Sequence, residues 1–263
     1  MLRLRIITAL LLAPFVLAAI FFLPENGMAV VLAALVAAGA WEWSAFAGLT
    51  RSSAKVGYVV LVLLSIAIVW FARSSGGAYI VLYAAMVWWI VALCWVLIWP
   101  GVVSYPSAAV AGLLVLVPAW LALSQLHSHD PQLMLFLLLL VVAADVGAYF
   151  AGRRFGRNKL APRVSPGKTW EGVGGGVVGA TIVATVGAVW LNMPFLVFIA
   201  LCVLVVCASI VGDLTESLFK RHAGLKDSGN LLPGHGGVLD RVDSITAAAP
   251  VFLVGLQALG LLQ

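Results

Sequence analysis

Long apolar runs recur along almost the whole chain and constrain its fold more than any other feature. About nine segments approach the ~20 apolar residues that an α-helix needs to cross the hydrocarbon core of a bilayer. Short turn-forming stretches separate them, such as Pro24-Glu25-Asn26-Gly27. The expected fold is therefore all-α, a polytopic integral membrane protein with about nine transmembrane helices. The predicted segments are 4–23, 28–48, 56–72, 78–99, 105–123, 132–151, 171–191, 195–212 and 244–262.

Composition agrees with this interpretation and leaves no room for a separate soluble domain. The chain is 63% hydrophobic and 10% charged, whereas soluble domains are about 25% charged. We expect one membrane domain, with amino-terminal helices in residues 1–130 and carboxyl-terminal helices with catalytic loops in residues 131–263. The apolar core of the first segment is too long for a signal peptide, so we expect a retained helix. The three cysteines lie in apolar runs and predict packing rather than disulfides.

The distribution of basic residues predicts the orientation. With nine spans, all but one of the 15 lysines and arginines fall on one side of the membrane, and Arg73 is the exception. Positive charge marks the cytoplasmic side, so we expect a cytoplasmic amino terminus and an inner (plasma) membrane protein whose polar loops face the cytoplasm. The net charge of +5 therefore predicts no nucleic-acid partner. Six tryptophans near segment ends suggest aromatic belts: Trp41, Trp43, Trp88, Trp89, Trp95 and Trp99.

One polar stretch, Ser217 to Asp243, departs from the apolar background. It reads SLFKRHAGLKDSGNLLPGHGGVLDRVD and mixes lysines, arginines, aspartates, a histidine and glycines. Cations bind phosphate oxygens, carboxylates hold Mg²⁺, and glycines let the backbone approach a ligand closely. The pattern therefore favours phosphate chemistry with a divalent metal. The alternative is an ordinary solvated loop between two membrane helices.

Two pairs of carboxylates border this stretch. Asp213 and Glu216 are three residues apart, as are Asp240 and Asp243, so each pair shares a helix face. Such pairs beside lysine and arginine could hold one or two cations. Alternatively, Asp240 and Asp243 cap a helix amino terminus. His235 could bind phosphate, ligate a metal or make a structural hydrogen bond.

Two further carboxylates lie inside apolar segments. Asp145 is a functional candidate, since charge within a membrane is costly; the alternative is an interfacial aspartate paired with a nearby arginine. Glu42 is similar, with helix pairing as its alternative. Residues 152–171, which follow Asp145, contain six basic residues. These favour phosphate binding or attraction to anionic lipids. The glycines that follow predict close helix packing: Gly172, Gly174, Gly175, Gly176 and Gly179.

The two polar regions together resemble the phosphatidate cytidylyltransferases, or CDP-diacylglycerol synthases. The first pattern is S-x-x-K-R-x4-K-D followed by P-G-H-G-G-x-x-D-R-x-D, within Ser217 to Asp243. The second is Asp145-x3-Tyr149-x2-Gly152-Arg153 followed by S-P-x-K-T-x-E-G from Ser165. The resemblance implies transfer of CMP from CTP to phosphatidate, giving CDP-diacylglycerol and pyrophosphate. It also implies a homodimer in the bilayer that uses Mg²⁺ and a second cation such as K⁺.

The resemblance also assigns roles to individual residues. The expected catalytic residues are Lys220, Arg221, Lys226, Asp227 and His235. Those expected to bind substrate are Asp145, Ser165, Lys168 and Arg241, and those expected to bind metal are Asp213, Asp240 and Asp243. Two other functions remain open at this point. One is a transporter of a phosphorylated solute or ion, although no internal repeat or pair of broken helices supports it. The other is a CTP-using lipid kinase, which would transfer the γ-phosphoryl group.

Overall fold

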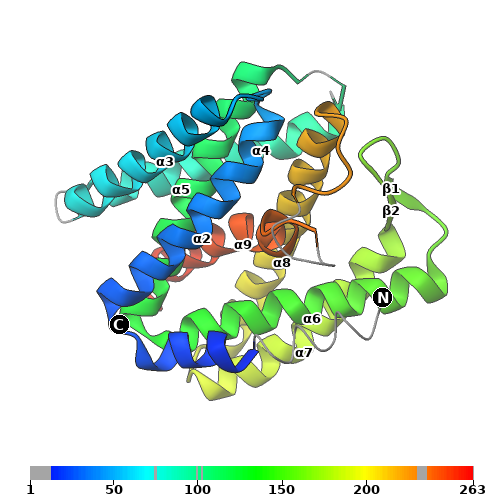
Figure 1. The fold of residues 1–263 in the computed structure, drawn as a ribbon. Coiled ribbons are helices and arrows are strands. Elements are labelled where there is room, and N and C mark those ends of the chain that lie inside the picture. The colour runs from blue at the N-terminus through cyan, green and yellow to red at the C-terminus, as the bar shows by residue number, and fades with distance from the viewer. Residues whose placement is uncertain (1–12, 74–75, 99, 102, 230–235, 263) are drawn as a thin grey trace.

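The computed structural model describes residues 13–73, 76–98, 100–101, 103–229 and 236–262, which form long helices and one short hairpin (Figure 1). A shorter apolar helix, Ala13–Phe22, precedes the first long one. The long helices are α2 (Glu25–Phe46), α3 (Ser52–Ala72), α4 (Gly77–Ile98), α5 (Tyr105–His129), α6 (Pro131–Phe155), α7 (Trp170–Trp190), α8 (Phe195–His222) and α9 (Leu239–Ala258).

The helices confirm the prediction of an all-α, polytopic membrane protein. Among the described residues, 7 helices, α2 to α8, are long and apolar enough to cross a bilayer. Helix α9 is not among them, and it carries Asp240, Arg241, Asp243 and Pro250. The first predicted segment is only partly described. The total of nine spans and the cytoplasmic amino terminus therefore stay predictions.

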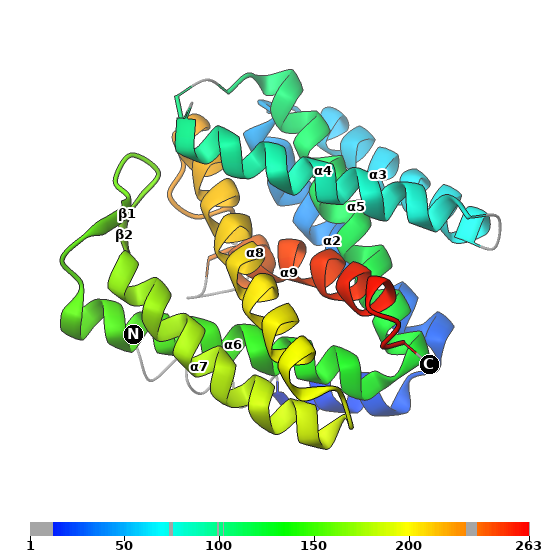
Figure 2. The same ribbon diagram turned by 180° about the vertical axis from the view of Figure 1, so that it is seen from behind.

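Helix α9 lies at the centre of the molecule (Figures 1 and 2). It packs against α8, α5, α6, α4 and α2. Ala247, Ala248, Phe252 and Leu253 are fully buried on it. Helices from both predicted sets, residues 1–130 and 131–263, thus contribute to one hydrophobic core around α9.

Helices α6 and α7 lie side by side in both views (Figures 1 and 2), and glycine allows their close approach. A Cβ atom on Gly179 would lie 2.7 Å from the carbonyl oxygen of Ala143. Gly172, Gly175 and Gly176 meet α6 in the same way, which confirms the packing predicted for them. Gly174 is different, since a Cβ atom there would meet open space.

Helix α8 continues ten residues beyond residue 212, where the predicted apolar segment ends. Leu218 and Phe219 are buried in the core and keep this polar sequence helical. The helix ends at His222, and Gly224 follows its C-cap residue with a φ of +69°, which suits glycine. The amide of Leu225 then donates back to the carbonyl of Lys220 at 2.8 Å. Several charged residues predicted to lie in a loop therefore lie on a helix.

A two-stranded antiparallel hairpin, β1 (Lys159–Ala161) and β2 (Ser165–Thr169), joins α6 to α7. It was not predicted, because the sequence here lacks an alternating apolar pattern. Its turn residue Val164 is buried against α4 and α8, where it contacts a cluster that includes Val96 and Leu218. The side chain of Thr169 then caps α7 by accepting from the Gly172 amide at 3.1 Å. The hairpin is thus anchored at both its turn and its base.

The aromatic-belt prediction was wrong for several tryptophans. Trp43 is buried, and its indole donates to the Ala108 carbonyl at 2.7 Å, joining α2 to α5. Trp88 and Trp89 are also buried. Trp41 is exposed and lies beside Lys55, as expected at a membrane boundary. Trp99 lies outside the described residues.

Candidate active site

A cleft of about 490 Å³ opens between α6, α7, α8, α9 and the hairpin. Asp145, Lys168 and Asp213 line it with charge, while Ala148, Leu160, Val173 and Ile210 make its apolar part. Asp145 comes from α6, Lys168 from β2 and Asp213 from α8. The structure therefore brings together three residues that were predicted to bind substrate or metal, from segments far apart in the sequence.

An ion pair joins two of these residues. The ammonium of Lys168 lies 2.6 Å from Oδ2 of Asp213, and about a quarter of each side chain is exposed. The hairpin positions Lys168, because Val164 fastens its turn to α8. Asp213 also accepts a 3.4 Å hydrogen bond from the hydroxyl of Ser217, one turn further along α8.

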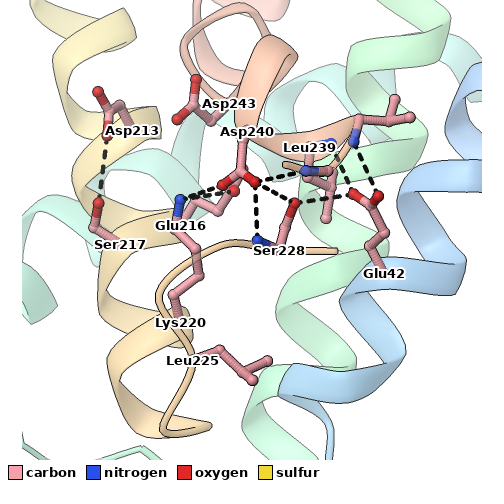
Figure 3. A network of polar contacts seen from close by, with 12 residues as sticks. Glu42, Asp213, Glu216, Ser217, Lys220, Leu225, Ser228, Leu239, Asp240 and Asp243 are labelled. Carbon is pink, nitrogen blue, oxygen red and sulfur yellow. Dashed lines mark hydrogen bonds and ion pairs between the residues drawn. The ribbon is translucent and has the colours of Figure 1, made fainter. Parts of the chain in front are cut away.

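Beyond the cleft, Lys220 is the centre of a buried charge network (Figure 3). Its ammonium lies 2.7 Å from Oδ1 of Asp240 and 3.2 Å from Oε1 of Glu216. The side chain of Lys220 is 11% exposed, that of Asp240 13% and that of Glu216 3%. The two carboxylates compensate the buried positive charge of Lys220. Because Asp240 belongs to α9, its ion pair with Lys220 joins α8 to α9.

The carboxylate of Asp240 is also bonded to the backbone. Its Oδ2 accepts from the amides of Ser228 and Gly237, both at 2.9 Å, and lies 3.0 Å from the Ser228 hydroxyl. Burial raises the pKa of Asp240, but the hydrogen bonds from Lys220, Gly237 and Ser228 outweigh it and hold the pKa below its usual value. Asp240 thus fixes the segment before α9 as well as pairing with Lys220.

Asp243 lies beside Asp213 where α8 crosses α9 (Figure 3). Burial, then the charges of Asp213 and Glu216, raise its pKa well above the usual value. Gly212 allows this close crossing, because a Cβ atom there would lie 2.6 Å from the Asp243 carbonyl. The charges of two carboxylates from different helices therefore interact at this crossing.

The carboxylates around Asp213 and Asp243 are candidate ligands for Mg²⁺. Among the described residues, no three carboxylates or histidines converge closely enough to hold a metal as they stand, since Asp240 faces Lys220 and backbone amides instead. The carboxylates nevertheless outnumber the lysines in this region, and the charges of Asp213 and Asp243 interact. Carboxylate oxygens shared with substrate phosphates are typical ligands of Mg²⁺. Any divalent cation held by these carboxylates would therefore take part of its ligands from a bound phosphate.

Other predicted site residues do not line the cleft. Arg221 is exposed on α8 and donates to the Leu225 carbonyl at 3.5 Å. Lys226, Asp227 and Arg241 are also exposed. Ser165 pairs with Ala161 in the hairpin. His235 lies outside the described residues.

The prediction did not include three residues that build the site, namely Glu42, Glu216 and Ser228. Glu216 was considered with Asp213, on one helix face, as part of a pair that could hold a cation, but it was given no role of its own. Glu42 was singled out as an intramembrane carboxylate, with helix pairing left open. Its carboxylate in fact bonds Ser228 and the start of α9 (Figure 3). No local pattern could link residues 186 positions apart.

Comparison with known proteins shows the family of the chain. The sequence profile of the cytidylyltransferase family matches residues 3–259. A phosphatidate cytidylyltransferase of Pseudomonas aeruginosa is 46% identical, over 99% of this chain and 98% of the relative. One of Haemophilus influenzae is 40% identical over 96% and 97%, and one of Brucella suis is 47% identical over 49% of each chain. The resemblance seen in the two polar motifs is confirmed: the chain belongs to the cytidylyltransferase family.

Proposed function

We propose that this protein transfers CMP from CTP to phosphatidate, giving CDP-diacylglycerol and pyrophosphate for phospholipid biosynthesis. The observation that carries the proposal is the cleft with the Lys168–Asp213 pair and an apolar lining, in a chain of this family. The relatives named phosphatidate cytidylyltransferase match it over almost their full length. A cleft of this composition suits a substrate that has both a phosphate and acyl chains.

The reaction needs charge neutralisation more than it needs a base. The phosphomonoester of phosphatidate has a second pKa near ~6, as phosphoserine does, so at neutral pH it is largely a dianion and already a nucleophile. Its approach to the α-phosphorus of CTP is opposed by repulsion between two polyanions. Lys168, on the anchored hairpin, is proposed to bind phosphate oxygens, and the apolar residues Leu160 and Val173, which line the same cleft, to contact lipid. Asp145 lines the same cleft and is proposed to contact substrate.

We assign the Mg²⁺ site to Asp213 and Asp243, with Asp240 beside them. Bound there, Mg²⁺ would stabilise negative charge on phosphoryl oxygens and on the leaving pyrophosphate. The interaction between the charges of Asp213 and Asp243 supports this assignment, because a cation would relieve their repulsion. Lys220 was predicted to be catalytic, and that role stays a prediction. We propose that it also holds Asp240 and Glu216 in place. Direct catalytic roles for Arg221, Lys226, Asp227 and His235, and substrate binding by Ser165 and Arg241, stay predictions.

The proposed location is the inner (plasma) membrane, with the cleft facing the cytoplasm, where CTP is available. The segregation of lysine and arginine along the sequence supports this orientation. Lys168 and Asp213 lie near the end of α8 that carries its basic residues, which agrees with a site at the membrane–water interface. Assembly as a homodimer and use of a second cation such as K⁺ stay predictions.

Labelled CTP tests the proposed function directly. Purified protein is incubated with phosphatidate, Mg²⁺ and CTP that carries label on either the α or the γ phosphate. The proposal expects lipid-borne label from the α position alone. Label from the γ position alone would indicate a lipid kinase, and no label in lipid from either would favour a transporter.

A further inference from the structure

We infer that Glu42 is a positioning residue for the site: from α2 it holds the segment before α9 and, through Ser228, it orients the Asp240 carboxylate. The inference rests on the proposed function only for its effect on the rate of synthesis, since the hydrogen bonds of Glu42 do not depend on that function. Glu42 does not line the cleft, so it acts through other residues and not on the substrate.

The carboxylate of Glu42 caps α9 from a different helix. Its Oε1 accepts from the amide of Val238, and its Oε2 from the amide of Leu239, both at 2.9 Å. The first amides of a helix have no partner within it, and the positive end of its dipole favours a carboxylate. Val238, at the N-cap position, supplies no side-chain cap of its own. Glu42 is 3% exposed, so this cap is sheltered from solvent.

Ser228 extends the contact from Glu42 to Asp240. Its hydroxyl lies 3.0 Å from Oε2 of Glu42 and 3.0 Å from Oδ2 of Asp240. Its amide donates to the same oxygen of Asp240. A serine hydroxyl has one proton to donate, so it bonds one carboxylate at a time. With its hydroxyl donating to Glu42 and its amide donating to Asp240, Ser228 connects the carboxylate from α2 with the carboxylate that Lys220 holds on α9.

Two glycines close the segment around Glu42. A Cβ atom on Gly229 would lie 2.6 Å from Oε1 of Glu42. One on Gly237 would collide with both Oε2 of Glu42 and the Ser228 hydroxyl. The sequence predicted that glycines here let the backbone approach a ligand. At these two positions the group approached is the internal carboxylate of Glu42.

The variant Glu42→Gln tests this arrangement, because the amide nitrogen of glutamine cannot accept from a backbone amide. The control is Glu25→Gln, in the same helix about 25 Å away at ~1.5 Å per residue. Glu25 pairs with Arg73 at 2.7 Å and lies outside the site. The first readout is hydrogen–deuterium exchange of the metal-free protein. We expect faster exchange in Glu42→Gln at Val238 and Leu239, and also at Ser228 and Gly237, whose amides bond Asp240. Glu25→Gln should leave these amides unchanged.

The second readout is the rate of CDP-diacylglycerol synthesis against Mg²⁺ concentration. Outer partners of metal-binding residues typically change metal affinity or activity about 10–100-fold, and we expect Glu42→Gln to fall in this range through a higher Mg²⁺ requirement and a lower kcat. Ser228→Ala, which removes only a hydroxyl, should shift the Mg²⁺ requirement in the same direction and is the variant to use if Glu42→Gln does not fold. In the Ser228→Ala background, Glu42→Gln should raise the Mg²⁺ requirement by a smaller factor than it does in the wild-type protein.

The outcomes separate the inference from the proposed function. A lower melting temperature with unchanged kcat, Mg²⁺ dependence and exchange at Ser228 and Gly237 would overturn it, because Glu42 would then only brace two helices. Wild-type behaviour of both Glu42→Gln and Ser228→Ala would overturn it as well. If the wild-type protein makes no CDP-diacylglycerol, the proposed function fails, and the exchange experiment still decides whether Glu42 controls the amides that bond Asp240.

Discussion

Replacing Lys220 by methionine should strongly destabilise the protein, apart from any effect on catalysis. Methionine keeps much of the length and apolar volume of lysine but removes its charge. The carboxylates of Asp240 and Glu216 would then remain 13% and 3% exposed without their shared cation. Each lies within 3.2 Å of the ammonium in the wild-type protein, so both lose their closest positive charge.

The magnitude follows from these distances. At an effective dielectric constant of ~20, each of the two charge contacts is worth roughly 5–6 kcal/mol of Coulomb energy. Desolvation of the buried ammonium offsets most of that in the wild-type protein. Removing one partner of a buried ion pair costs about 3–5 kcal/mol of unfolding free energy, because the other charge stays buried and uncompensated. A second substitution, Glu216→Gln, removes one stranded charge and should recover roughly half of the loss.

The assay is reversible unfolding in mixed detergent micelles titrated with sodium dodecyl sulfate, followed by circular dichroism. Arg221→Met is the matched control for stability: it is adjacent and exposed, so its unfolding free energy should change by no more than about 0.5 kcal/mol. A loss below about 1 kcal/mol for Lys220→Met would refute the reasoning, because that is the worth of a surface ion pair. A Glu216→Gln substitution that worsened the Lys220→Met variant would contradict it too.

Further predictions concern the metal site, the helix crossing and the orientation. Asp213→Asn should raise the Mg²⁺ concentration needed for half-maximal synthesis, since it removes charge and keeps shape; an unchanged Mg²⁺ dependence would argue against the assignment. Gly212→Val should cost roughly 1–3 kcal/mol of stability by overpacking and should lower activity, measured beside Gly174→Val, which faces open space and should be close to neutral. Reporter fusions after Lys168 should report the cytoplasm, whereas a fusion at the carboxyl terminus should report the exterior; the reverse would mean that the spans were miscounted.

The membrane fold could be predicted because it depends on features that are local in sequence. Runs of apolar residues specify the helices, and small residues four apart specify the packing of α7 on α6. The spacing of Asp213, Asp240 and Asp243 beside basic residues likewise predicted metal ligands from local sequence, and that role stays a prediction. Asp243 does lie close enough to Asp213 for their charges to interact where α8 crosses α9.

The rest could not be predicted, because it depends on contacts between distant segments. The end of α8 is set by the burial of Leu218 and Phe219, and the hairpin by the anchoring of Val164. Neither leaves a periodic pattern. The exposure of Arg221 follows from the extension of α8, because the helix places Lys220 inward and Arg221 outward. Lys226 lies just after Gly224, which ends the helical path, and is exposed too.

The amino-terminal helices take part in the site although the polar motifs lie in the other half. Trp43 follows Glu42 in α2, is bonded to α5, and packs its ring 5.3 Å from that of Phe219 on α8. This packing fixes α2 against the helix that carries Asp213 and Lys220, and it leaves Glu42 pointing at the start of α9. A substitution in the first half, far from any motif, can therefore alter how Asp240 is held. The core around α9 is shared by both halves, so the geometry of the site depends on the packing of the whole membrane domain.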